Sequence, residues 1–201
     1  LRVARGDFHR LQWASDPEAP ATRALADGQV RLVVEQFALT ANNITYAAFG
    51  EAMKYWQFFP TADATLGCIP VWGFARVVES RCAGIDVGTR VYGYLPMGTY
   101  LVVQPARVSD SGFVDASAHR ADLAAAYNRY DVCSTDPLYR AEHVGLQALL
   151  RPLFTTSFLI DDFFAEQAHF GARRLLLSSA SSKTAYGTAF CLTRRKARPQ
   201  I

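Results

Sequence analysis

The 201-residue sequence lacks the features that would assign it to a metal-binding, disulfide-rich or membrane class. Its four cysteines stand far apart and form no Cys-x-x-Cys pair, so neither a local metal loop nor a dense disulfide framework is visible. No apolar run approaches the ~18–20 residues of a membrane span, because Asp161 and Asp162 interrupt the most hydrophobic stretch. The sequence therefore predicts no membrane partner.

Charge of one sign is also scarce. The net charge is +3, and much of the excess lies in the late stretch TRRKARPQI, residues 193–201. A nucleic-acid partner is not expected, because it would need clustered basic residues interleaved with aromatics. Half of the residues are hydrophobic, which predicts a packed core, and dispersed reduced thiols favour a cytoplasmic location. The chain begins without Met and without a signal-peptide pattern, and we interpret it as a segment of a longer protein.

The first part of the sequence has the pattern of several β-strands. Residues 29–39 alternate apolar and polar side chains, residues 69–80 form a second strand, and residues 84–109 contain two more around a turn at Pro96 and Gly98. Short strands with turn signals every 8–12 residues favour a small barrel or sandwich over about residues 30–110. The small-residue stretch 14–28 is expected to be a linker or loop.

The pattern changes near residue 116. Residues 116–132 are Ala-rich with helical spacing, and residues 136–171 are helical too, with a break at Pro152 after which Asp161 and Asp162 can cap the next segment. Residues 172–180 then predict a strand, and residues 183–196 a helix. The expected fold is mixed α+β: a β-rich domain over 1–115, a helical connection over 116–170, and a first β-α unit over 171–201.

Four segments in this order resemble the medium-chain dehydrogenase/reductase superfamily, specifically an outlying branch on its zinc-independent, quinone-oxidoreductase side. They are DGQVRLVVEQFALTANNITYAAFG, IPVWGFARVVES, GIDVGTRVYGYLPMGTYLVVQPARV and RRLLLSSASSKTAYGTAFCL. The resemblance implies a GroES-like β-barrel joined to an incomplete Rossmann domain, with NADPH (slightly preferred) or NADH in the cleft between them. It further implies hydride transfer to a small-molecule carbonyl, enone or quinone, and a homodimer is compatible with it.

The turn before the last helix is the candidate cofactor site. Ser179, Ser182 and Ala185 stand where a dinucleotide-binding turn prefers glycine. Hydroxyls, the N–H groups at the start of the helix and a lysine can nevertheless hold a phosphate. The cofactor-binding candidates here are Ser179, Ser181, Ser182, Lys183 and Thr184. A plain strand–helix turn is the main alternative. A P-loop is disfavoured because both of its glycines are missing.

The early loop NNITY carries the candidate catalytic residues. Asn42 or Asn43 would donate to the acceptor oxygen, and Tyr46 would line the hydride site as a hydroxyl or ring wall, as the resemblance implies. The alternative is an Asn turn that caps a helix, with Tyr46 in the core. The family's zinc-binding His-Glu pair is replaced by Trp72 and Gly73, and the histidines show no ligand spacing, so no metal is expected.

Two further groups have a functional and a structural interpretation. Thr155, Thr156 and Ser157 fall where the family places a Thr near the nicotinamide carboxamide, yet they can equally bond back to their own helix. The aromatic segment 55–59 suits either a core or a planar acceptor. For the whole chain, the alternative to an oxidoreductase is a GroES-like binding or interaction module whose nucleotide loop has decayed.

Overall fold

The computed structural model describes residues 1–13 and 22–201, so part of the expected linker, residues 14–21, lies outside the described residues. The chain divides into two compact units, Leu1–Ala148 and Leu149–Ile201. The boundary falls within helix α2 (Val144–Glu166), near its first turns.

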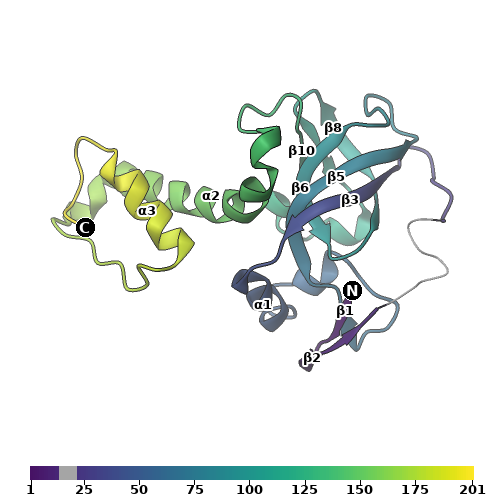
Figure 1. Ribbon diagram of the computed structural model, residues 1–201, viewed down its shortest axis with the longest axis horizontal. Coiled ribbons are helices and arrows are strands. Elements are labelled where there is room, and N and C mark those ends of the chain that lie inside the picture. The colour runs from purple at the N-terminus through teal and green to yellow at the C-terminus, as the bar shows by residue number, and fades with distance from the viewer. Residues whose placement is uncertain (14–21) are drawn as a thin grey trace. The chain divides into compact units, whose positions relative to one another are not determined.

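The first unit is built on a seven-stranded antiparallel sheet that curls into a half-barrel (Figure 1). The strand order is β7-β3-β5-β6-β10-β9-β8. Its two edge strands follow one another in the chain with Gln104 between them, so the sheet must curl to bring its edges together. The strands are β3 (Val30–Ala38), β5 (Pro70–Ser80), β6 (Arg90–Pro96), β7 (Tyr100–Val103), β8 (Pro105–Ser109), β9 (Gly112–Asp115) and β10 (Arg129–Val132).

The alternating pattern predicted the long strands correctly. Val30 and Leu32 of β3 are fully buried, while Arg31 between them is more accessible, as one apolar face of a half-covered sheet requires. β3 pairs along its length with β5, which pairs in turn with β6. A smaller antiparallel sheet has the order β2-β1-β4, formed by β1 (Arg2–Ala4), β2 (Asp7–Gln12) and β4 (Leu66–Gly67).

The helix expected over residues 116–132 is wrong. Two short 3₁₀ turns, Ala118–Arg120 and Ala125–Tyr127, occupy this segment, and strand β10 follows them. The Ala-rich spacing suggested a helix, but the segment is held instead by long-range contacts. Tyr130 of β10 is fully buried and its hydroxyl donates to the carbonyl of Tyr94 at 2.8 Å. Residues 116–148 accordingly belong to the same compact unit as the sheet.

The second unit contains most of α2 and all of α3 (Lys183–Thr193), with a 3₁₀ turn at Ala168–Gly171 between them. Pro152 lies inside α2 without ending it, so the expected break is wrong. A proline removes one backbone donor, but α2 continues past it and is 23 residues long. Asp161 and Asp162 do not cap a new segment. They lie within α2, and both pair with Arg195 after α3.

The strand expected over 172–180 is reduced to a single parallel bridge between Arg174 and Gln200. The Leu175 N–H donates to the Gln200 carbonyl at 2.8 Å, and the Gln200 N–H donates to the Arg173 carbonyl at 2.9 Å. Leu176 beside the bridge is 92% exposed. The chain therefore runs from residue 174 through α3 to residue 200, where the two segments meet in one isolated parallel bridge.

Candidate functional site

The serine-rich turn before α3 holds five of the candidate residues together. Ser182 is the N-cap of α3, with extended backbone (φ −70°, ψ 143°), and its Oγ accepts from the Ala185 N–H at 3.0 Å. The Ser182 N–H donates to the Ser179 carbonyl at 3.0 Å, which closes the turn. No residue from 178 to 185 has a positive φ. The turn is thus built without the left-handed conformation that a glycine would supply.

The start of α3 has uncompensated positive charge. Its first turn contains the exposed Lys183 and no acidic residue. In the described part of the chain, Lys183 has no ion-pair or hydrogen-bond partner. The helix dipole is positive at the same end, and the N–H groups of the first turn have no partners within the helix. This end of α3 therefore favours an anion.

The hydroxyls of Thr155, Thr156 and Ser157 bond back to their own helix. Thr155 donates to the Arg151 carbonyl at 2.9 Å, and Thr156 to the Pro152 carbonyl at 3.2 Å. Ser157 is fully buried, and its Oγ lies 3.0 Å from the Leu153 carbonyl and 2.8 Å from the Thr184 carbonyl. The structure shows back-bonding, and it adds that Ser157 links α2 to α3.

Gly187 is a residue that sequence reasoning missed. A Cβ at this position would lie 2.5 Å from the Ser157 Oγ and 2.9 Å from the Ser157 Cβ, so the absence of a side chain lets α3 approach α2 (Figure 1). A glycine inside a predicted helix is the sequence signal that points to such a close approach.

A pocket of about 420 Å³ opens beside this turn, within the second unit. Leucine and phenylalanine side chains of α2 form one wall, and aromatic side chains of α3 form the other. Ala180, Ser181 and Lys183 bring the serine-rich turn to the same pocket. The apolar and aromatic side chains that line the pocket are Leu150, Leu153, Phe154, Tyr186 and Phe190.

In the first unit, NNITY is helical, so its interpretation as a loop is wrong. Helix α1 (Ala41–Ala48) begins after the N-cap Thr40, whose Oγ1 accepts from the Asn42 N–H at 3.2 Å. Asn43 is buried; its Oδ1 accepts from the Thr40 N–H at 2.7 Å and its Nδ2 donates to the Pro70 carbonyl at 2.9 Å. The amide of Asn43 is engaged at both ends, as the helix-capping alternative required.

Tyr46 lies one turn after Asn42 on α1 and is 6% exposed. Its hydroxyl accepts from the Trp72 Nε1 at 3.3 Å. Burial raises the pKa of Tyr46 above its ordinary value, although Trp72 and Asn42, which interact with the hydroxyl, partly offset this. Tyr46 therefore keeps its proton at neutral pH, and with Trp72 donating to it, its own O–H remains a donor.

An aromatic cluster surrounds Tyr46. Its ring centroid lies 4.7 Å from that of Tyr55 and 5.6 Å from that of Tyr94. Tyr94 is fully buried, its hydroxyl has no hydrogen-bond partner among the described residues, and burial strongly raises its pKa. The aromatic side chains of segment 55–59 are buried as well, so they form core rather than an open wall: Tyr55, Trp56, Phe58 and Phe59.

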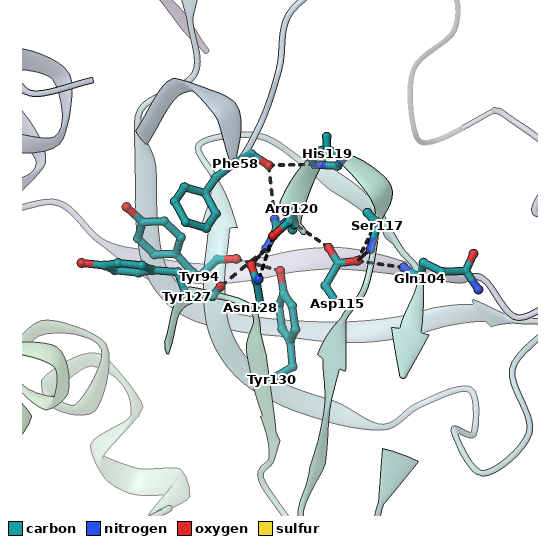
Figure 2. A network of polar contacts seen from close by, with 10 residues as sticks. All are labelled: Phe58, Tyr94, Gln104, Asp115, Ser117, His119, Arg120, Tyr127, Asn128 and Tyr130. Carbon is teal, nitrogen blue, oxygen red and sulfur yellow. Dashed lines mark hydrogen bonds and ion pairs between the residues drawn. The ribbon is translucent and has the colours of Figure 1, made fainter. Parts of the chain in front are cut away.

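A buried ion pair stands beside this cluster (Figure 2). The Arg120 Nε lies 3.0 Å from the Asp115 Oδ2, and each side chain is 1% exposed. Asp115 Oδ1 also accepts from the Ser117 hydroxyl at 2.6 Å and from the Gln104 N–H at 3.0 Å. Arg120 donates to the Phe58 carbonyl at 3.3 Å. The pair connects the end of β9 to the aromatic segment 55–59, and no sequence motif predicted it.

Across residues 1–13 and 22–201, no three His, Cys, Asp or Glu side chains are placed to hold a metal ion. Trp72 donates to Tyr46, and a Cβ at Gly73 would lie 2.2 Å from the Gln36 carbonyl oxygen, so both positions serve packing. Over the same residues, no helix combines the length and apolar character needed to cross a membrane.

The fold and these sites define a mixed α+β protein with a curled antiparallel half-barrel and a helical unit that carries a candidate anion site. Residues 37–201 match the family DUF2855, described as a protein of unknown function, and the chain belongs to this family. A comparison with curated proteins finds no match. The family match makes no connection to the medium-chain dehydrogenase/reductase superfamily, so that resemblance stays a prediction.

Proposed function

We propose that this chain is part of an NAD(P)H-dependent oxidoreductase that reduces a carbonyl, enone or quinone without zinc. The observation that carries the proposal is the parallel pairing of Arg174 and Gln200 around α3. A β-α-β connection with a polar turn at the start of its helix is the arrangement in which α/β proteins hold the phosphates of dinucleotides. On this proposal the half-barrel is GroES-like and the second unit begins a Rossmann domain.

The residues of the turn fit a phosphate group. Donors are supplied by the N–H groups of Lys183 and Thr184 at the start of α3, by the Lys183 side chain, which has no partner among the described residues, and by the exposed hydroxyls of Ser179 and Ser181. The Ser182 hydroxyl accepts from Ala185 and retains its own proton to donate. We assign the pyrophosphate of NADPH or NADH to this turn. Thr184, whose carbonyl accepts from Thr188 and Ser157, supports the turn through its backbone.

When bound, a reduced nicotinamide supplies a hydride, and the chain must orient and polarise the acceptor. Tyr46 is the best candidate for polarisation, because burial keeps its hydroxyl protonated and Trp72 donates to the hydroxyl oxygen, which leaves the O–H as a donor. Asn42 is the second candidate, since it interacts with the same hydroxyl. Asn43 is withdrawn from this role because its amide is already bonded to Thr40 and Pro70.

A non-catalytic binding module is the second candidate function. The observation that favours it is the absence of positive φ from residue 178 to residue 185, because a dinucleotide turn uses glycine to bring its backbone close to the pyrophosphate. A side chain at each of these positions holds a ligand farther from the backbone. On this alternative the turn caps α3 and binds no nucleotide.

Titration of the protein with NADPH and with NADH, followed by calorimetry, tests the proposal. We expect micromolar binding that Lys183→Glu abolishes, because the substitution replaces the unpaired cation with a charge that repels phosphate. The matched control is Lys196→Glu, which reverses an exposed lysine in the same unit outside the turn. Absence of binding at millimolar cofactor would contradict the oxidoreductase proposal and favour the non-catalytic binding module.

A further inference from the structure

The pocket beside the serine-rich turn combines apolar walls with a polar, positively charged rim. Its walls are apolar and include three rings, those of Phe154, Tyr186 and Phe190. All three side chains are substantially exposed, with Tyr186 at 74%. Its volume of about 420 Å³ lies within the range of small-molecule sites. An aromatic ring is the group that such walls bury best, through offset or edge-to-face contacts.

The rim of the same pocket carries the uncompensated positive charge. Lys183 and Ser181 line the pocket, and the first turn of α3, with no acidic residue, begins there. A lysine in the first turn is unfavourable, because the N-terminal end of the helix dipole is also positive. The positive charge of Lys183 and the positive end of the dipole therefore lie together. An anion bound at this rim would neutralise both.

We propose that this pocket binds an aromatic phosphate monoester, with its ring between α2 and α3 and its phosphate on the turn. The proposal rests on the proposed function in that both use the serine-rich turn. It adds the place where the aromatic ring of the ligand binds, between α2 and α3, which the proposed phosphate site does not specify. Phosphate suits the rim better than a carboxylate, because its three terminal oxygens can use the serine hydroxyls, the helix N–H groups and Lys183 together.

The test uses 1-naphthyl phosphate, whose fluorescence reports burial of its ring, with the complete 201-residue chain. We expect saturable binding that is at least about tenfold tighter than binding of 1-naphthol or of inorganic phosphate alone, because each lacks one half of the recognition. Equal binding of 1-naphthyl phosphate and 1-naphthol would overturn the proposal, since the rim would then add nothing.

Two variants separate the two halves of the site. Lys183→Met should weaken 1-naphthyl phosphate about tenfold and leave 1-naphthol unchanged, whereas Tyr186→Ala should weaken both by about that factor. Lys196→Met is the control, because it removes a lysine of the same unit outside this pocket. Circular dichroism establishes that each variant is folded. Loss of affinity in the control as large as in Lys183→Met would contradict a defined site.

Competition distinguishes the source of the ring and separates this proposal from the oxidoreductase proposal. Displacement of 1-naphthyl phosphate by nicotinamide mononucleotide or AMP identifies a nucleotide ring, and displacement by neither identifies another aromatic phosphate; both results support the pocket. If NADPH binds in a Lys183-dependent manner while Tyr186→Ala and 1-naphthyl phosphate have no effect on it, the oxidoreductase proposal stands and the pocket proposal fails. If 1-naphthyl phosphate binds and no dinucleotide does, the reverse holds.

Discussion

The two units of this protein bury different kinds of side chain. The first unit packs aliphatic and aromatic residues against its curled sheet, and a core of fully buried side chains runs along β3, β5 and β6. The second unit, by contrast, has six buried side chains among its described residues, and three of them are polar: Ser157, Asp161 and Thr188. The other three are Cys191, Leu192 and Pro199. Rings such as Phe154, Phe158 and Tyr186 are exposed there instead.

The difference indicates how each unit is held. Burial of apolar area stabilises the first unit, and the buried Arg120–Asp115 pair is tolerated there because the two opposite charges lie 3.0 Å apart. The second unit depends on a few specific contacts between helices. They are the Ser157 hydroxyl at the Thr184 carbonyl, the close approach at Gly187, and the Arg195 pair with Asp161 at 2.8 Å. Substitutions should therefore act on the two units through different mechanisms.

The largest effect is expected in the first unit, from Arg120→Met. Removing one partner of a buried pair leaves the Asp115 carboxylate buried without its countercharge, at a cost of about 3–5 kcal/mol in the free energy of unfolding. Urea unfolding followed by tryptophan fluorescence measures it, because Trp13, Trp56 and Trp72 all lie in the first unit.

Arg129→Met is the matched control for Arg120→Met. Arg129 pairs with Asp131 at 2.7 Å, but its side chain is 45% exposed, so the loss should stay below about 1 kcal/mol. Equal losses for the two variants would contradict the view that burial makes the Arg120 pair critical.

A smaller effect, confined to the second unit, is expected from Gly187→Val. The new side chain would meet Ser157 at less than contact distance, and overpacking of this kind costs about 1–3 kcal/mol. Hydrogen exchange of the α3 amides should accelerate, while the fluorescence transition of the first unit stays in place. Tyr186→Val places the same β-branched residue at an exposed position of α3 and controls for helix propensity. Slower exchange in Gly187→Val would show that the helices are not in close contact there.

The smallest expected change in unfolding free energy, counted for each tyrosine side chain, is the response of the first unit to alkaline pH. Burial raises the pKa of Tyr46, Tyr94, Tyr127 and Tyr130. Above about pH 10 an unfolded chain loses these protons while the folded chain retains them. The unfolded state then binds fewer protons, so stability is full below about pH 10 and falls above it by up to about 1.4 kcal/mol per pH unit for each tyrosine.

Urea midpoints measured at a series of pH values, together with tyrosinate absorbance, check this expectation. Tyr127→Phe should reduce the slope above about pH 10. Tyr186→Phe, which alters an exposed side chain of the second unit, should leave the slope of the first unit unchanged. A midpoint that does not move with alkaline pH would mean that these hydroxyls are accessible to solvent in the folded state.

Local pattern predicted elements well where the burial was one-sided. The alternation of Val30, Leu32 and Val34 identified β3. The turn expected at Pro96 and Gly98 marked the end of β6, although β6 itself is buried on both faces. The start of α3 was also readable, because Ser182 is a typical N-cap. Local pattern failed over 116–132, since Tyr130 and Arg120 obtain their partners from residues far away in the sequence.

The sequence named candidate residues, and the structure distinguishes between interpretations for some of them. The sequence named the serine-rich turn as the cofactor site, and that role stays a prediction; the structure shows that Ser182 caps α3 there. For Asn43 and Ser157 the sequence left two interpretations, and the structure favoured the structural one because both side chains are bonded to backbone groups. The pocket was not foreseen, because it needs Phe154 and Tyr186 from two helices at once.

The sequence by itself determined where strands alternate, where α3 begins, and that the turn before it carries hydroxyls and a lysine in place of glycine. These features depend on neighbours within a few residues, so their physics is local. Tertiary structure alone decided that Arg120 is buried against Asp115 and that the Asn43 amide donates to the Pro70 carbonyl. It also decided that Lys183, which has no partner among the described residues, lies beside an aromatic pocket. Burial and pairing depend on chain segments distant in sequence, and no short pattern encodes which of them will meet.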